Sequence, residues 1–233
     1  MEYADGGALR NYLKKNFDKL TWEDKHNLAF QLACAVSCLH DEGIVHRDLH
    51  SGNILIHQGI IKLADFGLSK RIEKATKQQS QVFGVIPYID PKSFNRRSDN
   101  DNNTSQQYIL NQKSDVYSVG VLLWEISSGR PPFYVEGEKY DIGLAIEISQ
   151  GLREKIVPST LREYSNIYTE CWDNNPDKRP TMNQVVDKLN AIISKTGIMT
   201  EDVQMDNYNS NHQLSKHNNN REFDLEKNRE NNK

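Results

Sequence analysis

The sequence predicts a mainly α-helical fold, a helical bundle around one buried central helix, with a small β-hairpin. Three patterns lead to this prediction: an apolar segment from Val116 to Ile126, a long amphipathic pattern that ends at Gly43, and two short β-rich segments around Gln58-Gly59. A helix that is apolar on nearly every side is buried on every side. The segment from Val116 to Ile126 should therefore be the hub of the fold.

The long amphipathic pattern predicts the first core-facing helix. It begins at Thr21-Trp22-Glu23-Asp24, which has the form of a capping box. Apolar residues then recur at helical spacing as far as Gly43, namely Leu28, Leu32, Ala35, Val36 and Leu39.

The hairpin is predicted from the two β-rich segments at 54–56 and 60–63, which flank Gln58-Gly59. A short connection that contains glycine between such segments is typical of a tight β-hairpin. If the turn has two residues, Asn53 pairs with Ala64 across the ladder.

Further helices are expected after the hairpin. The central helix ends where Ser127-Ser128-Gly129 precedes Pro131-Pro132. Helical patterns then run from Asp141 to Gln150, from Ser165 to Trp172, and onward from a capping sequence at Thr181 to Gln184. The last helix has an apolar inner face formed by Val185, Leu189 and Ile192.

The length and composition favour one domain with a polar tail. A chain of 233 residues is long enough for one well-cored domain, which we expect to span 1–195. The stretch 96–107 offers no apolar residue to bury and is predicted to be a solvated loop insertion. The segment 196–233 is rich in Asn and charged residues and is predicted to be a disordered tail.

The charge pattern gives no sign of a nucleic-acid or membrane partner. The formal net charge is -3, and Lys and Arg are scattered among acidic residues. No apolar segment is long enough to span a bilayer or to serve as a signal peptide. The expected location is therefore the cytoplasm or the nucleus.

Cys34 and Cys38 lie four residues apart on the predicted helix, which is one spacing of metal ligands. A zinc site needs about four ligands, and no other residues are spaced to complete one. Buried thiols are the favoured interpretation.

Two motifs carry the candidate chemistry: the segment from His46 to Asn53, which reads His-Arg-Asp-Leu-His-Ser-Gly-Asn, and Asp65-Phe66-Gly67. Taken singly, Asp48 and Asn53 could be turn residues and the triplet a strand end. In this order, with the hairpin between them, the motifs resemble the catalytic loop and the metal-binding motif of eukaryotic-type protein kinases. The expected fold is then the C-terminal lobe of such a kinase.

The resemblance assigns roles to three residues. The predicted hairpin brings Asp65 back beside Asn53, and oxygen groups of this kind suit Mg²⁺ bound with ATP phosphates. Asn53 and Asp65 are therefore the expected metal ligands. Asp48 is expected to receive or orient the proton of the hydroxyl of a protein substrate.

The resemblance extends over residues 1–195. It includes Gly84 to Pro91, Asp115 to Val121 and Asp177 to Pro180, and it is greatest to the tyrosine-kinase-like group, most members of which act on Ser and Thr. Phosphoryl transfer to Ser or Thr, with Tyr as a further possibility, and a role in signal transduction are what this implies. Oligomeric state is not readable from the sequence.

The start of the chain resembles the hinge of the family. By this resemblance, the Glu2 carbonyl and the Ala4 amide would face adenine, and Leu55 would pack beneath the ring. The Gly-rich loop, the strand lysine and the helix glutamate of the N-terminal lobe do not occur in the sequence. We therefore expect a truncated record of a longer gene, inactive as this chain.

Other roles also follow from the resemblance. Asp115 would bond the catalytic loop backbone, although an acidic residue opening a helix is also explained by the helix dipole. His46 and Phe66 would stack in an apolar spine, rather than His46 acting as an acid or base. Arg47 would pair with a phosphate on the segment 66–91, for which Ser69, Thr76 and Ser80 are the candidates.

Three positions depart from the family pattern. His50 replaces a lysine that contacts the transferred phosphate in Ser/Thr-type relatives, and Val85 replaces a threonine bonded to the catalytic Asp. Lys92 replaces a glutamate that pairs with an arginine, here Arg179, so two cations are expected to meet.

Two functions therefore remain open from the sequence. The first is a protein kinase represented by its catalytic lobe. The second is a non-catalytic docking module of the same fold, which the absence of the lysine-bearing lobe favours.

Overall fold

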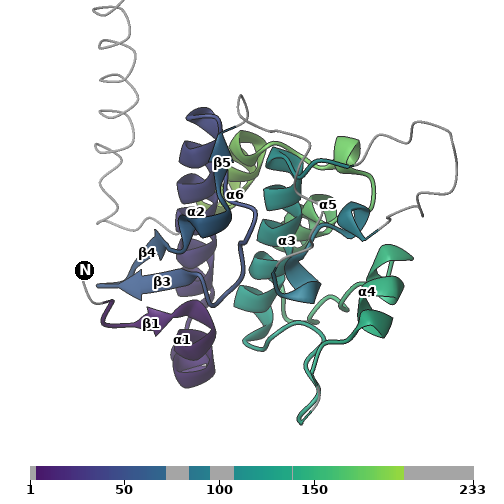
Figure 1. The fold of residues 1–233 in the computed structure, drawn as a ribbon. Helices are drawn as coiled ribbons and strands as arrows, with labels where there is room; N and C mark the ends of the chain where they lie inside the picture. Colours follow the sequence, from purple (N-terminus) through teal and green to yellow (C-terminus); the bar gives the residue numbers. More distant parts are fainter. Residues whose placement is uncertain (1–3, 72–83, 95–107, 138, 197–233) are drawn as a thin grey trace, which may run out of the picture. The chain divides into compact units, whose positions relative to one another are not determined.

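The computed structural model describes residues 4–71, 84–94, 108–137 and 139–196, which lie within the compact unit Met1–Thr196. The fold is mainly helical with a small antiparallel sheet, as predicted. Figure 1 shows α1 and α4 on either side of α3, and α2 beside the sheet. The helices are α1 (Leu9–Asn16), α2 (Trp22–Asp41), α3 (Gln112–Ser128), α4 (Ile142–Ser149), α5 (Arg162–Cys171) and α6 (Met182–Thr196).

The described strands form two small antiparallel sheets. The first has the order β1-β3-β4, and the second pairs β2 with β5. Short 3₁₀ turns connect the elements, among them η1 (Phe17–Lys19), η2 (Phe66–Leu68), η4 (Ile86–Tyr88), η5 (Pro91–Ser93) and η6 (Pro176–Lys178). The strands are β1 (Gly7–Ala8), β2 (Ile44–Val45), β3 (Ile54–His57), β4 (Ile60–Leu63) and β5 (Lys70–Arg71).

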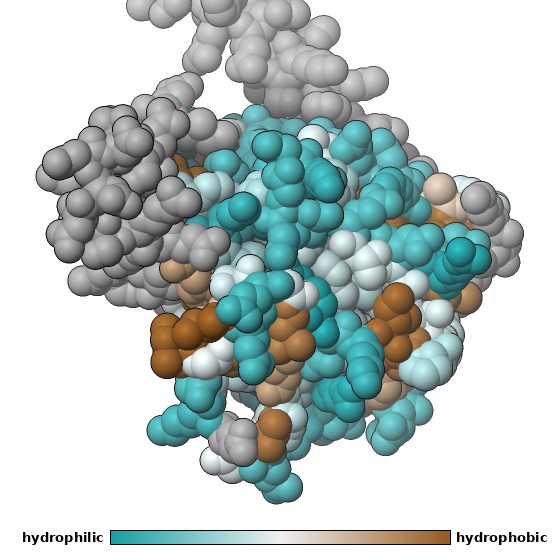
Figure 2. All heavy atoms as spheres, turned by 90° about the vertical axis from the view of Figure 1, so that its right-hand side faces the viewer, coloured by the Kyte–Doolittle hydropathy of each residue, from teal (hydrophilic) through white to brown (hydrophobic). Residues whose placement is uncertain are grey.

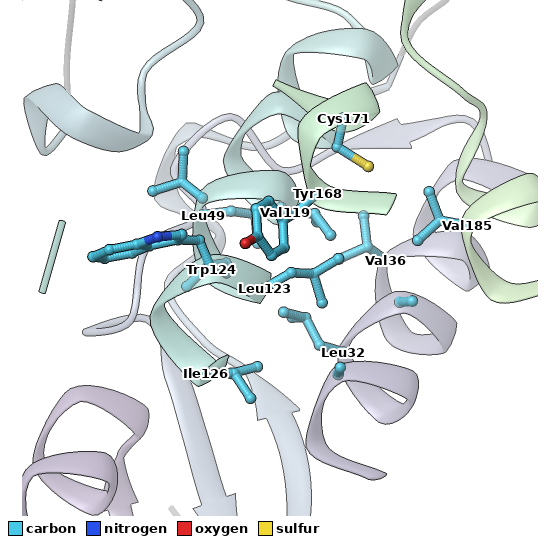
Figure 3. Packing of buried hydrophobic residues seen from close by; sticks show 14 of the residues in the cluster. Leu32, Val36, Leu49, Val119, Leu123, Trp124, Ile126, Tyr168, Cys171 and Val185 are labelled. Atoms are coloured by element: carbon cyan, nitrogen blue, oxygen red, sulfur yellow. The ribbon is translucent and has the colours of Figure 1, made fainter. Parts of the chain in front are cut away.

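Helix α3 is the hub that the sequence predicts. Every residue from Ser114 to Ser127 is buried, and the helix packs against α2, α5 and η4. It ends at Gly129, whose φ of 74° suits a residue without a Cβ atom. Figure 3 shows side chains of α2, α3 and α5 meeting in one core, labelled Leu32, Val36, Val119, Leu123, Trp124 and Tyr168.

The contact between α3 and α5 depends on a glycine. A Cβ atom on Gly120 would lie 2.7 Å from Cys171 Cβ and 3.1 Å from both the Trp172 nitrogen and the Tyr168 oxygen. Real Cβ atoms do not approach other atoms so closely, so the two helices could not remain at this separation.

We expect Gly120→Ala to destabilise the fold by about 1–3 kcal/mol, the usual cost of overpacking a core. This loss opposes the gain of about 1 kcal/mol that alanine normally brings to a helix interior. Urea unfolding measures the difference. Asn190→Ala, at an exposed position of α6, is the control and should leave stability equal or slightly higher. Equal stability of both variants would contradict the tight helix contact.

Helix α2 begins with the predicted capping box. The Thr21 hydroxyl accepts the Asp24 backbone N–H at 3.1 Å, and the Asp24 carboxylate accepts the Thr21 N–H at 2.8 Å. The prediction of buried thiols is wrong for Cys38, which is exposed because it lies on the face opposite the core, while Cys34 is half-buried. Burial raises the pKa of the Cys34 thiol to about 11.

The hairpin has the predicted two-residue turn. Gln58 and Gly59 have φ values of 51° and 75°, as a type I′ turn requires. The ladder pairs Ile54 with Leu63, and the Ala64 N–H donates to the Asn53 carbonyl at 2.9 Å. The predicted pairing of Asn53 with Ala64 is therefore confirmed.

Several elements differ from the sequence prediction, among them the short strands β1, β2 and β5, which were not expected. Helix α1 was not expected, although Leu9 and Leu13 are its buried residues at helical spacing. Helix α5 begins at Arg162, three residues before the predicted start at Ser165. The capping box that opens α6 is confirmed, since Thr181 and Gln184 exchange two hydrogen bonds.

The structure does not describe the residues of the predicted loop insertion and tail. The predicted loop insertion at 96–107 lies outside the described residues, as does the predicted tail beyond Thr196. Within the described ranges, none of the helices has the length and apolarity needed to cross a membrane.

Candidate active site

The catalytic-loop segment between β2 and β3 is held by a buried carboxylate of α3. Asp115 accepts the backbone N–H groups of His46 and Arg47, each at 2.8 Å, and faces His40 Nε2 at 3.0 Å. The predicted bond from Asp115 to the loop backbone is therefore confirmed. Arg47 has a φ of 73°, an uncommon conformation that these bonds stabilise.

Asp48 and Asn53 are fixed to each other within this loop. The Asn53 amide nitrogen donates to the Asp48 carbonyl oxygen at 3.0 Å and to Asp48 Oδ2 at 3.1 Å. These two bonds use both hydrogens of the amide, so the Asn53 side-chain oxygen is left as an acceptor. The Asp48 side chain is 15% exposed, which leaves it open on one side.

Asp65 is brought back to this loop by the hairpin. Its neighbour Ala64 bonds the Asn53 carbonyl at 2.9 Å, and Asp65 itself has a left-handed conformation with φ 59°. Its exposed carboxylate accepts the Gly67 N–H at 3.2 Å. An amide oxygen and a carboxylate are a donor set that fits Mg²⁺, which retains water or phosphate oxygens beside one or two protein ligands.

His46 has a packing role, as the sequence predicts. It is fully buried, its Nε2 lies 3.1 Å from the Ala64 carbonyl, and its ring lies 5.0 Å from the ring of Phe66. Phe66 remains 47% exposed. The two rings tie the catalytic loop to the segment that carries Asp65.

His50 lies beside Asp48. His50 Nδ1 accepts the Gly52 N–H at 3.1 Å, so a neutral ring carries its proton on Nε2, which lies 3.8 Å from Asp48 Oδ1. Burial of the ring lowers the pKa of His50, against the opposing effect of the Asp48 charge. The position that holds lysine in Ser/Thr-type relatives therefore presents an uncharged N–H group at neutral pH.

The expected meeting of Lys92 with Arg179 does not occur. Arg179 instead forms a bidentate ion pair with Asp90, with N···O distances of 2.7 and 3.0 Å, and both side chains are fully buried. Asp90 also accepts the Tyr108 hydroxyl at 2.7 Å. The prediction was wrong because a carboxylate two residues before Lys92 takes the place of the missing glutamate.

A polar network beside the loop was missed by sequence reasoning. The Tyr88 hydroxyl donates to the buried Glu125 carboxylate at 2.6 Å and lies 3.1 Å from Ser51 Oγ. Arg10 donates to both hydroxyls, at 3.2 Å to Ser51 and 3.4 Å to Tyr88. Burial raises the pKa of Glu125. A carboxylate inside the otherwise apolar segment from Val116 to Ile126 was the available signal.

The candidate adenine-facing residues are only partly described. Glu2 lies outside the described residues. The Ala4 carbonyl accepts the Gly7 N–H at 3.1 Å in the turn before β1. Leu55 is half-buried between the buried Ile54 and Ile56, so its side chain lies on the opposite face of β3 from the core.

The predicted phosphate-bearing residues are also partly described. Ser69 Oγ donates to the His46 carbonyl at 3.3 Å, which holds it close to the catalytic loop. Arg47 donates to the Leu110 carbonyl at 3.3 Å. Thr76 and Ser80 lie outside the described residues. Val85, which also departs from the family pattern, packs against the hydrophobic core.

Comparisons with known proteins agree with this geometry. A family model described as protein tyrosine and serine/threonine kinase matches residues 1–189. The chain is 32% identical over 205 residues to the dual specificity protein kinase splA of Dictyostelium discoideum, a match that covers 79% of the chain and 8% of that relative.

Two further relatives show the same range of similarity. The chain is 31% identical over 202 residues to the probable serine/threonine-protein kinase roco5 of Dictyostelium discoideum, covering 81% of the chain and 7% of the relative. It is 32% identical over 213 residues to the LEAF RUST 10 disease-resistance locus receptor-like protein kinase-like 1.4 of Arabidopsis thaliana. This match covers 82% of the chain and 30% of the relative. The chain thus spans less than a third of the length of these relatives.

Proposed function

The chain belongs to the protein tyrosine and serine/threonine kinase family, and we propose that its described lobe orients a protein hydroxyl for transfer of the γ-phosphoryl group of ATP. The observation that carries the proposal is the arrangement of three side chains. Asn53 is bonded to Asp48 through its amide nitrogen, and the backbone pairing of Asn53 with Ala64 brings the next residue, Asp65, back to this loop. Together, these side chains offer one general base and two metal ligands.

The proposed roles follow from the hydrogen bonds. Asp48, held at Oδ2 by Asn53 and open on one side, accepts or orients the proton of the acceptor hydroxyl. Asn53 and Asp65 would hold Mg²⁺, which would supply neutralisation of the charge that develops on the transferred group. The neutral His50 ring, whose Nε2 lies 3.8 Å from Asp48 Oδ1, adds no cation to the phosphate site.

The nucleotide site is proposed at the edge of the small sheet. Glu2 and Ala4 would bond the adenine edge, and Leu55 would pack beneath the ring. Ser or Thr is the proposed acceptor by resemblance to the tyrosine-kinase-like group, with Tyr as the second candidate, since relatives named for both Ser/Thr and dual specificity are similar.

Transfer is expected once phosphate-positioning groups are supplied. The 233 residues contain no Gly-rich loop, strand lysine or helix glutamate of the family pattern, and those groups position the phosphates. We expect a chimera of this chain with the N-terminal lobe of a related kinase to transfer radiolabelled phosphate from ATP to casein, to a Glu-Tyr polymer, or to both. The pair of acceptors also reports the choice between Ser/Thr and Tyr.

The competing function is a docking module of kinase fold that transfers nothing. It is favoured by His50 and Val85, which replace two polar groups expected near Asp48. A chimera that folds and binds ATP, measured by calorimetry, but labels neither acceptor would support this alternative and contradict the proposal.

A further inference from the structure

A groove opens beside the candidate base and continues across the lobe. It has a cavity volume of about 1120 Å³ and lies between α1, the segment 84–86, the residues after α3, and α4. Gly84 is one of its lining residues, and a Cβ atom there would lie 3.0 Å from Asp48 Oδ1. A polypeptide with its hydroxyl at Asp48 would therefore place its neighbouring side chains in this groove.

Cationic side chains line the groove. They are Arg10, Lys14, Arg130 and Lys139. Within the described ranges, none of them forms an ion pair with a carboxylate. Arg10 is half-buried and donates to the Ser51 and Tyr88 hydroxyls, whereas Lys14 and Arg130 are exposed.

Lys14 and Arg130 lie on the same side of the groove. Gly129, directly before Arg130, packs against the ring of Phe17, which follows α1. The Arg130 guanidinium lies 5.7 Å from the centre of the Trp124 ring, a cation–π arrangement that restricts its position. Lys14 stands in the last turn of α1. We refer to Lys14 and Arg130 as the cationic wall.

The acidic groups of the groove are mostly used within the fold. Asp141 caps α4 by accepting the Leu144 N–H at 2.9 Å, Glu154 accepts the Phe133 N–H at 2.6 Å, and Glu125 accepts the Tyr88 hydroxyl. Glu147 is exposed on α4. Glu125 lies on α3, and Asp141, Glu147 and Glu154 lie on or beside α4, whereas α1 contributes Arg10 and Lys14 to the lining and no acidic residue.

The outer surface near α4 carries exposed apolar residues. Figure 2 shows this side of the molecule, where hydrophobic patches are separated by hydrophilic residues. Ile142 and Ile146 are exposed there, by 76% and 51%. Tyr134 and Val135, which line the groove, are also exposed, by 60% and 53%. An acceptor segment therefore meets apolar and cationic side chains, and the cations are what distinguishes an anionic segment from a basic one.

We propose that the groove selects acceptor segments with an anionic side chain, a carboxylate or a phosphate, close to the acceptor hydroxyl, and that Lys14 and Arg130 are the residues that read it. The inference rests on the proposed function, because that function places the acceptor at Asp48. Exposed cations without carboxylate partners attract an anionic segment and repel a basic one. The selection should weaken as salt screens these charges.

The test measures binding, which needs no phosphoryl transfer. Fluorescein-labelled peptides with a central serine carry Glu, phosphoserine, Gln or Lys at the flanking positions, and fluorescence anisotropy gives their affinity for the complete 233-residue chain. We expect the Glu and phosphoserine peptides to bind about tenfold more tightly than the Gln peptide at low salt, and the Lys peptide least tightly. The Glu and phosphoserine arms distinguish the two anions.

Charge reversal tests whether Lys14 and Arg130 recognise the anionic side chain. The double variant Lys14→Glu and Arg130→Glu should lose the preference for the Glu peptide, whereas Lys15→Glu, at an exposed α1 residue outside the groove, should retain it. Circular dichroism confirms that each variant folds. Equal binding of all four peptides, no binding of any, or an equal loss in the Lys15 variant would overturn the proposal. The chimera's transfer assay is independent, so a failure of the proposed function is seen separately.

Discussion

In the chimera with an N-terminal lobe from a related kinase, Asp48→Asn should lower kcat by roughly 10²- to 10⁴-fold, the usual contribution of one general base. The loss corresponds to about 3–5 kcal/mol in the activation free energy. Asn retains the size of Asp48 and an oxygen that can accept from Asn53, which lies 3.1 Å from Oδ2. The loop backbone should therefore stay in place while the basic oxygen is lost.

The kinetic form of the loss separates chemistry from binding. If Asp48 acts mainly in the transition state, kcat and kcat/KM fall together while KM for the acceptor changes little. Asp18→Asn, an exposed residue of η1, is the control and should change neither constant. A fall of less than tenfold in the Asp48 variant would remove Asp48 from the role of base.

Local patterns predicted the elements that surround this site. The turn at Gln58-Gly59 determines the register of the hairpin, and this register is enough to place Ala64 against Asn53. The nearly all-apolar run within α3 predicted the hub because few structures other than a fully buried helix suit such a segment. Helix α1 was missed because eight residues give little more than two turns of periodicity.

Contacts between distant segments could not be predicted in this way. Arg10 meets Tyr88 across 78 positions of sequence, and Tyr88 meets Glu125 across 37. No local sequence pattern predicts which hydroxyl will donate to a buried carboxylate. The resemblance gave the loop and its Asp115 anchor correctly, since those contacts accompany the motif. It gave no account of Glu125, which lay within a segment interpreted as apolar.

The family pattern also failed to predict the partner of Arg179, which is Asp90. Lys92 occupies the position of the family glutamate, but a carboxylate need not come from that position if a nearby backbone can present one. Asp90 lies just before η5, where its side chain also accepts the Lys92 N–H at 3.0 Å. The ion pair is thus preserved while its acidic partner has moved by two residues.

Asp90→Ala should therefore lower the free energy of unfolding by about 3–5 kcal/mol, the cost of leaving one member of a buried ion pair without its partner. The reason is that Arg179 is fully buried in the native fold, and its charge would lose both carboxylate bonds. At roughly 2–4 °C per kcal/mol for a domain of this size, Tm should fall by about 6–20 °C. Thermal unfolding followed by circular dichroism measures the change.

Two further variants test whether Arg179 pairs with Asp90 or with the residue at position 92. Adding Arg179→Met to Asp90→Ala should recover part of the loss, because the unpaired charge is then removed along with its partner. Lys92→Glu should change stability by no more than about 0.5 kcal/mol, as is usual for a surface substitution, because Arg179 already has two bonds to Asp90. A stabilising Lys92→Glu together with a harmless Asp90→Ala would show that Arg179 is anchored at position 92 instead, and that the activation segment follows the aligned pattern after all.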